Sequence, residues 1–151
     1  MQREPLDLRT TLEDCAKENG VVLRFDNFPS PCTVTADPTA LRQVFSNLMR
    51  NSKEAERAGS PVVITAEAEN KGNHMLIRVS DNGSGIPQDK LSKIFIPFFT
   101  TKAEGTGLGL ALVHRIVTDH GGAVSVVSSD AGTTFTIALP RAAENSANSG
   151  V

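Results

Sequence analysis

Two pairs of segments with alternating apolar and polar residues constrain the fold of this 151-residue chain most strongly. Residues 62–69 and 75–80 flank the turn residues 70–73, and residues 123–129 and 133–140 form the second pair. Alternation with a period of two on both sides of a short turn is typical of an antiparallel hairpin. The sequence therefore predicts antiparallel strands at the centre of the fold, not a regular alternation of parallel strands and helices.

Three further segments have the apolar spacing of amphipathic helices. Residues 6–19 precede Gly20, a favoured residue just beyond a helix end, and residues 108–120 precede a pair of glycines. The third helix is predicted over residues 38–58, because Asp37 can cap it and Pro38 is tolerated in a first turn. Together these segments predict an α/β fold in which three helices cover one face of a mixed, mainly antiparallel sheet of about five strands.

The connecting segments complete this prediction. Short strands are expected at residues 21–28 and 33–35, and a brief helical stretch at residues 90–95. The length of the chain suits one domain, which we expect to span residues 1–140, and the polar residues 141–151 are expected to form a disordered tail. An irregular segment as long as residues 81–109 is unusual in a compact domain and is typical of functional loops.

Composition excludes several classes of partner. Fifteen Lys and Arg residues against seventeen Asp and Glu residues give a formal charge of -2, so no basic field indicates binding to nucleic acid. No apolar run approaches the roughly 18 residues that span a bilayer, so we expect no direct membrane contact. Cys15 and Cys32 lack metal-site spacing and are expected to be buried free thiols, which fits a cytoplasmic location.

The first chemical motif lies on the predicted second helix. Asn47 and Asn51 are four residues apart and therefore share one helix face, which Glu54 extends. Amide oxygens are neutral, hard ligands suited to Mg²⁺, which usually takes only one or two protein ligands. Taken alone, however, the pattern favours a solvated polar edge, because two amides do not define a metal site.

The second motif is the run from Asp81 to Pro87 at the end of a predicted strand. The Asp81 carboxylate can accept a hydrogen bond from the exocyclic amine of adenine, and Gly83 and Gly85 leave room for the ring. An Asn-Gly dipeptide is also an ordinary turn signal. Taken alone, these residues favour a turn and a binding site about equally.

Two further motifs surround the loop that follows. Residues 105–109 alternate glycine with other residues before an apolar helix, and free N–H groups at a helix start bind anions such as polyphosphates. Neither the dinucleotide fingerprint nor a Walker A loop is present. Residues 95–99 hold three of the seven phenylalanines and indicate an aromatic anchor for a mobile lid, although alone they favour plain core.

These motifs in this order, followed by residues 132–135 before a terminal strand, resemble the N, G1, F, G2 and G3 boxes of histidine kinases. That family belongs to the ATPase superfamily that includes gyrase, Hsp90 and MutL. The resemblance covers residues 6–140 and is closest in style to the nitrogen-regulator kinases. It implies a two-layer α/β sandwich of the Bergerat type, with residues 1–5 as the end of a connection from a preceding domain.

The resemblance implies ATP and Mg²⁺ as ligands and assigns residues to them. Asn51 would coordinate Mg²⁺ with support from Asn47, and Lys102 would contact a phosphate from the lid. Asp81 would hold the adenine amine, and Thr133 a water beside it. The implied ATP-binding set is Asn51, Asp81, Gly83, Gly85, Ile86, Phe99, Thr101, Lys102, Gly105, Thr106, Gly107, Leu108, Gly109 and Thr133.

The chain departs from the family pattern at several positions. Glu54 and Thr100 stand where many relatives carry basic residues, and Lys102 is the expected substitute for the missing phosphate contact. ATP-hydrolysing members carry a glutamate at the position of Asn47, and an amide cannot accept a proton at neutral pH. The resemblance therefore implies transfer of phosphate to another protein's nucleophile, with Asn47, Asn51 and Lys102 as the catalytic set.

The phosphate acceptor is expected outside this chain, because none of its three histidines lies in a phosphoacceptor motif. The resemblance implies a histidine on a separate dimerisation domain, a response regulator as the next acceptor, and a homodimeric parent kinase with a monomeric isolated domain. Two alternatives stay open, an anti-sigma-factor serine kinase and a nucleotide-sensing module without transferase activity. His120 is expected to have a structural role at a helix end.

Overall fold

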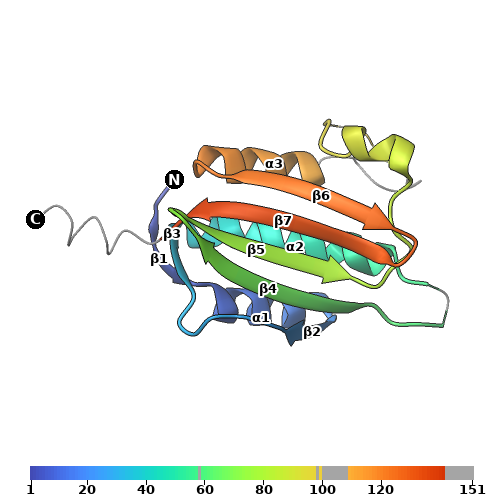
Figure 1. Cartoon of the computed structure of the whole chain (residues 1–151), viewed down its shortest axis with the longest axis horizontal. Helices are drawn as coiled ribbons and strands as arrows, with labels where there is room; N and C mark the ends of the chain where they lie inside the picture. The colour runs from blue at the N-terminus through green and yellow to red at the C-terminus, as the bar shows by residue number, and fades with distance from the viewer. Residues whose placement is uncertain (58, 98, 100–108, 142–151) are drawn as a thin grey trace, which may run out of the picture.

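A computed structural model describes residues 1–57, 59–97, 99 and 109–141 of the chain. Its main layer is a five-stranded sheet (Figure 1). The strands follow the order β2 (Val22–Phe25), β4 (Val63–Lys71), β5 (His74–Asp81), β7 (Gly132–Pro140) and β6 (Ala123–Ser129). β2 pairs with β4 in parallel, and every other neighbour is antiparallel. The predicted mixed sheet and both predicted hairpins are confirmed.

Three helices pack against one face of this sheet, as Figure 1 shows. They are α1 (Leu8–Asn19), α2 (Pro38–Glu54) and α3 (Gly109–Asp119). Alternate residues of β4, β5 and β7 are buried beneath them, and α2 contributes Leu41, Val44, Phe45, Leu48 and Met49 to the same core. Full burial of each such side chain favours folding by about 1.5–3 kcal/mol, so the apolar face of α2 fixes which edge of the helix stays accessible.

A second, two-stranded sheet was not predicted. β1 (Glu4–Asp7) pairs antiparallel with β3 (Thr33–Ala36), with Glu4 opposite Ala36. The predicted helix start at residue 6 is therefore wrong. α1 begins at Leu8, and Asp7 caps it by accepting a hydrogen bond from the Thr10 backbone N–H. Residues 4–7 form a strand because their partner strand lies almost thirty positions away in the sequence, and local periodicity carries no signal of such a partner.

Other element boundaries differ by a few residues. β2 ends at Phe25 and not at residue 28, and α2 ends at Glu54 and not near residue 58. The expected helical stretch at 90–95 is a 3-10 helix, η1 (Gln88–Lys93), that starts directly after Pro87. Arg141, expected to begin the tail, forms an isolated bridge with Val34, and residues 142–151 lie outside the described part of the chain.

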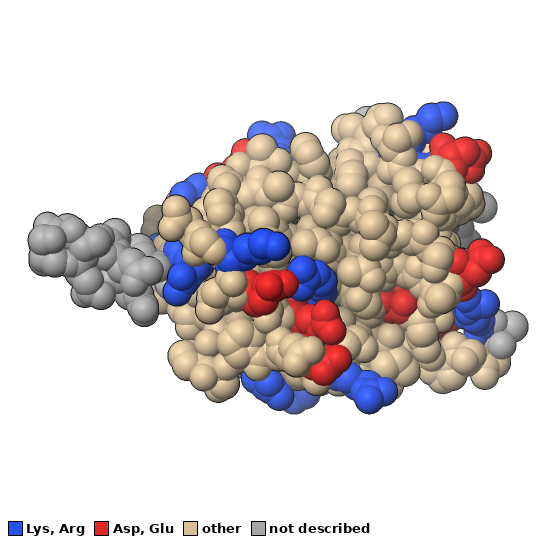
Figure 2. Space-filling model, in the orientation of Figure 1, with Lys and Arg blue, Asp and Glu red and all other residues tan. Residues whose placement is uncertain are grey.

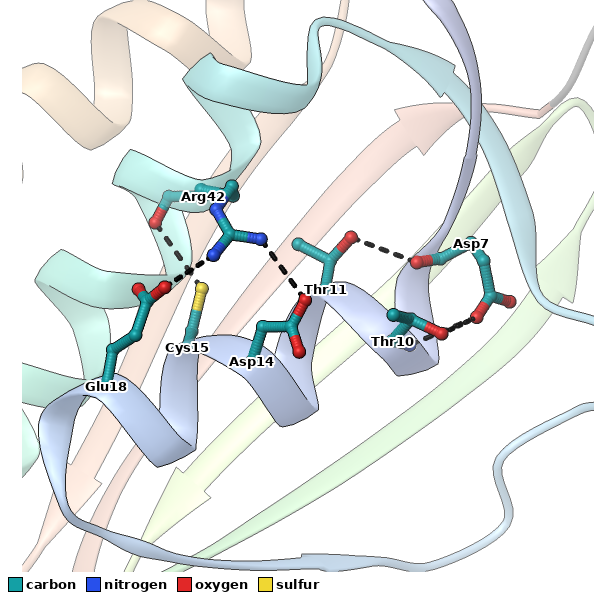
Figure 3. A network of polar contacts seen from close by, with 7 residues as sticks. All are labelled: Asp7, Thr10, Thr11, Asp14, Cys15, Glu18 and Arg42. Atoms are coloured by element: carbon teal, nitrogen blue, oxygen red, sulfur yellow. Dashed lines mark hydrogen bonds and ion pairs between the residues drawn. The ribbon is translucent and has the colours of Figure 1, made fainter.

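The seam between α1 and α2 is polar at its surface and apolar beneath. Figure 3 shows Arg42 of α2 paired with Asp14 and Glu18 of α1. These ion pairs are partly exposed, so each contributes little to stability. Below them, Cys15 is fully buried, and Cys32 is 1% exposed. Both cysteines are free, as predicted.

The surface carries charges of both signs. On the face seen in Figure 2, basic and acidic side chains are interspersed, in agreement with the small net charge. Within the described residues, no helix combines the length and the apolar character that crossing a membrane requires.

Candidate functional site

Asp81, the last residue of β5, is held by groups from three parts of the fold. Ser52 of α2 donates its hydroxyl to Oδ2 at 2.8 Å. The Gly83 backbone N–H donates to Oδ1 at 2.8 Å, and the Thr133 backbone N–H of β7 approaches the same oxygen at 3.3 Å. A carboxylate offers about four acceptor positions, so Asp81 is oriented by these donors and still has capacity for a ligand.

The two glycines after Asp81 pack against protein backbone. A Cβ atom on Gly83 would lie 2.6 Å from the Ala55 carbonyl oxygen at the end of α2. Gly85 has a φ of +83°, and its Cβ would lie 2.0 Å from the Ser129 carbonyl oxygen. Both positions therefore require glycine for the fold itself, because a side chain would collide with backbone that cannot move aside. Their predicted role in shaping a base pocket stays a prediction.

Thr133 and Ile86 meet beside this loop through Ser128 of β6. The Ser128 and Thr133 hydroxyls are 2.8 Å apart, and the Ile86 backbone N–H donates to the Ser128 hydroxyl at 2.7 Å. Thr133 is only 4% exposed. The structure thus brings four predicted residues, Asp81, Gly85, Ile86 and Thr133, into one cluster at the ends of β5, β6 and β7. Ser128 completes the cluster and was not predicted.

The polar edge of α2 lies next to this cluster. Asn47 donates through Nδ2 to the Gln43 carbonyl oxygen and accepts through Oδ1 from Arg50 at 2.6 Å. Asn51 is half-buried, and among the described residues its side chain has no hydrogen-bond partner. The amide of Asn51 is therefore available to a ligand, whereas that of Asn47 is engaged at both ends.

Ser52 links these two parts of the site and was missed from the sequence. It is 3% exposed and lies four residues after Leu48, on the apolar stripe of α2. A hydroxyl on a buried stripe must find a hydrogen-bond partner, and this requirement was a usable signal. Because Ser52 follows Asn51 directly, its bond to Asp81 fixes the amide edge of α2 beside the carboxylate.

An open hollow of about 610 Å³ lies between α2 and the start of α3. Asn47 and Gly109 meet at its wall, where a Cβ atom on Gly109 would lie 3.0 Å from Asn47 Oδ1. Two guanidinium groups border the hollow, of which that of Arg42 is paired with Asp14 and Glu18 and that of Arg50 donates to Asn47. Its lining consists of Thr39, Arg42, Gln43, Ser46, Asn47, Arg50, Gly109 and Leu112.

The other predicted residues have mixed outcomes. Phe99 is partly buried against the core. Phe95 contacts the His114 ring at 5.7 Å and the Phe135 ring at 6.4 Å between centroids, so this part of the aromatic segment belongs to the core. Thr101, Lys102, Gly105, Thr106, Gly107 and Leu108 lie outside the described residues, and their roles stay predictions.

The described side chains do not form a closed metal centre. Within that part of the chain, no group of three or more His, Cys, Asp or Glu side chains is placed to hold a metal ion. Mg²⁺ does not need one, because it commonly takes one or two protein oxygens and completes its shell with phosphate oxygens and water. The unpartnered amide of Asn51 fits that requirement, and it would need a phosphate-bearing ligand beside it.

Comparison with known proteins agrees with this geometry. The histidine kinase-, DNA gyrase B- and HSP90-like ATPase family matches residues 36–143. The sensor histidine kinase ZraS of Escherichia coli K12 is 46% identical over 83% of the chain and 27% of its own length. The sensory histidine kinase/phosphatase NtrB of Azospirillum brasilense is 35% identical over 93% of the chain and 40% of its own length. The nucleotide-free catalytic domain of histidine kinase ThkA superposes with a TM-score of 0.80 at 30% identity, covering 95% and 99% of the two chains.

The chain therefore belongs to the histidine kinase-, gyrase B- and HSP90-like ATPases, as an ATP-binding catalytic domain of the sensor histidine kinase type. The predicted fold and family are confirmed, and the similarity to NtrB agrees with the resemblance to nitrogen-regulator kinases. The chain spans about a quarter of the length of ZraS.

Proposed function

We propose that this domain binds Mg²⁺-ATP and transfers the γ-phosphoryl group to a histidine on a separate dimerisation domain of its parent kinase. From that histidine the phosphoryl group would pass to a response regulator. The parent would be a homodimer, and the domain would act on the cytoplasmic side of the membrane whether or not the parent is anchored there.

The observation that carries this proposal is the hydrogen bond between Ser52 and Asp81. It joins the helix edge that bears Asn51 to the carboxylate at the end of β5, so a single ligand can contact both. A nucleotide has the matching chemistry, with a base amine for the carboxylate and a metal-bound polyphosphate for the amide. The similarity to the histidine kinases ZraS and NtrB supports the same assignment.

The roles of the residues follow from their contacts. Asp81 would accept a hydrogen bond from the adenine amine, and Thr133 would hold a water beside it through the network with Ser128. Asn51 would hold Mg²⁺, which supplies charge neutralisation on the phosphates when it is bound. Lys102 and residues 105–109 would contact the phosphates from the lid, as the family pattern implies.

The reaction is transfer and not hydrolysis, because Asn47 occupies the position at which ATP-hydrolysing members of the superfamily carry a general base. Both ends of its amide are engaged, with Gln43 and Arg50, and an amide has no basic site at neutral pH. In the proposed step a histidine nitrogen forms a bond to the γ-phosphorus. The bond from that phosphorus to the bridging oxygen breaks, and ADP leaves. Positioning and charge stabilisation carry most of such a barrier.

Labelled ATP tests the proposal. The domain is incubated with the dimerisation domain of its parent and γ-³²P-ATP, with and without Mg²⁺. We expect a Mg²⁺-dependent label on the dimerisation domain that acid removes and base retains, as for phosphohistidine. An acid-stable label on another protein would identify a serine kinase. Nucleotide binding without transfer would leave a sensing module, and either result would overturn the proposal.

A further inference from the structure

His120 is a buried titratable group that the proposed reaction does not use. It follows the last residue of α3 and is 3% exposed. Its ring lies between two helices. Nδ1 is 2.8 Å from the Ile116 carbonyl oxygen in α3, and Nε2 accepts a hydrogen bond at 3.1 Å from the backbone N–H of Asp37, the N-cap of α2.

These two contacts define the protonation state of the ring. A backbone N–H can only donate, so Nε2 must be unprotonated to accept from Asp37. The proton of the neutral ring is then on Nδ1, where the Ile116 carbonyl oxygen accepts it. A doubly protonated ring would place two donors against each other at Nε2. Such an arrangement leaves a buried donor without a partner, which is unfavourable.

The charged groups around the ring are engaged elsewhere. The Asp37 carboxylate accepts from the Ala40 and Gln2 backbone N–H groups, and these bonds lower its pKa. Arg3 donates to the Asp119 carbonyl oxygen at 2.6 Å, and the Asp119 carboxylate lies 3.9 Å from Arg115. The ring of His120 therefore ties α3 to α2 through a hydrogen bond to backbone and not through an ion pair.

α3 meets α2 a second time at its other end. Gly109, the first residue of α3, lies against the Asn47 side chain of α2. Asp37 and Asn47 are ten residues apart on α2, and Gly109 and His120 are eleven apart, so the two contacts span matching helix lengths of about 15 Å. The helices run antiparallel and approach each other at both ends, and Val113 and Val117 of α3 are buried.

We propose that His120 is a positioning residue for nucleotide binding. Its neutral, Nδ1-protonated ring fixes the end of α3 on the first turn of α2 and thereby sets where Gly109 meets Asn47. Because α3 meets α2 at both of its ends, loosening the His120 contact lets α3 turn relative to α2, and this turn changes the position of Gly109 against Asn47. The effect on nucleotide affinity rests on the proposed function, whereas the tie itself does not.

The first test needs no substitution and no nucleotide. Long-range ¹H–¹⁵N spectra of ¹⁵N-histidine-labelled domain report which ring nitrogen carries the proton. We expect the His120 ring to carry a proton on Nδ1 and none on Nε2. A proton on Nε2, or a doubly protonated ring, would overturn the proposal even if every variant failed to fold.

The second test compares two substitutions of similar size. His120→Gln retains an acceptor that can reach the Asp37 N–H, whereas His120→Leu fills the space without one. Arg115→Ala is the control, since Arg115 is exposed on the same helix. We expect His120→Leu to shift the resonances of the Asn47 side-chain amide and the Gly109 backbone amide. It should also weaken Mg²⁺-ATP binding roughly 2- to 30-fold.

His120→Gln should recover most of both signals, and Arg115→Ala should change neither. If His120→Leu keeps the wild-type resonances and affinity, the ring only fills space and the proposal is wrong. If the wild-type domain does not bind Mg²⁺-ATP at all, the proposed function fails by itself. The Asn47 and Gly109 resonances then still decide whether His120 sets the position of α3.

Discussion

The two ends of the candidate site are built in different ways. At the base end, Asp81 is held by donors from α2, from its own loop and from β7, and the neighbouring glycines touch backbone on α2 and β6. At the phosphate end, the described polar groups come from one helix edge, and Asn51 has no hydrogen-bond partner among the described residues. Under the proposed function, the base end is complete before a ligand binds, whereas the phosphate end would need metal and phosphate to complete it.

This difference predicts which substitutions should change the stability of the fold and which should change phosphotransfer. Changes at the base end disturb packed backbone and should affect folding as well as affinity. Changes at the phosphate end should leave the fold almost unaltered and act on transfer, because the side chains there are partly exposed and not held by other elements. The predictions below test that separation, from the largest expected effect to the smallest.

Asn51→Ala should lower Mg²⁺-dependent phosphotransfer more than roughly 100-fold, since metal sites lose 10- to 100-fold even when only a supporting group is removed. Phosphotransfer by the complete parent kinase measures the effect, and circular dichroism should show a native fold. Gln43→Ala is a matched control about two turns earlier on the same helix. If Asn51→Ala retains phosphotransfer, Asn51 is not the metal ligand, and the proposed contrast between the two ends of the site is wrong.

Gly85→Ala should destabilise the domain by roughly 2–4 kcal/mol, because a left-handed backbone and a collision with the Ser129 carbonyl oxygen add together. Gly109→Ala is the counterpart at the phosphate end. There the new Cβ meets only the tip of the Asn47 side chain at 3.0 Å, which can turn away. Urea unfolding should therefore show a change of less than about 1 kcal/mol for Gly109→Ala. Equal losses of stability in Gly85→Ala and Gly109→Ala would contradict the difference between the two ends of the site.

Asp81→Asn should weaken ATP binding by roughly 1–3 kcal/mol, the scale of a lost charge-assisted hydrogen bond. An amide also presents a donor on one side, so either Ser52 or the Gly83 N–H loses its acceptor. Calorimetric titration with ATP measures the affinity, and GTP serves as the comparison because it lacks an amine at the same ring position. Unchanged ATP affinity would exclude Asp81 as the base ligand.

Ser52→Ala should weaken ATP binding by about 0.5–1.5 kcal/mol, the net contribution of a typical hydrogen bond, because Ser52 orients the Asp81 carboxylate and would not itself contact the ligand. Asp81 would retain the bond from the Gly83 backbone N–H and so keep most of its orientation. Ser46→Ala, a serine on an accessible part of the same helix, is the control. A loss of ATP affinity as large as that expected for Asp81→Asn would show that the orientation of the whole carboxylate depends on Ser52.

Acid should loosen the first turn of α2. Backbone hydrogen bonds, first from Ala40, hold the pKa of Asp37 below its ordinary value of 3.8. A lowered pKa in the folded state means that the stabilisation is present above pH 3.8 and is lost as the pH falls through the folded value. Asp37→Asn keeps a capping side chain that does not titrate, so its stability should show less pH dependence in this range.

The sequence was most informative where local patterns carry the structure. The stripe of α2, the capping residues Asp37 and Pro38 and the two hairpins were all readable, because each depends on neighbours within one element. β1 could not be predicted from the sequence, because its four residues form a strand only when they pair with β3. The end of β2 was also misplaced, since apolar composition continues past Phe25 while the pairing does not.

The site divides in the same way. Asn47, Asn51, Asp81 and Thr133 were predicted as an ordered set of motifs, and their roles stay predictions. Ser52 and Ser128 were missed. The place of Ser52 on the apolar stripe of α2 indicates that it needs a hydrogen-bond partner but not which residue supplies it, and Ser128 carries no such signal.

By itself the sequence determined the main helices, the two hairpins, the family and the order of the motifs, since these depend on residue types at fixed spacing along the chain. Only the tertiary structure decided that Ser52 meets Asp81, that Gly85 faces backbone and that His120 ties α3 to α2. The physical reason is that hydrogen bonds and close packing act over a few ångströms. Residues separated by 29 or 83 positions come within that range only after the sheet and helices have packed.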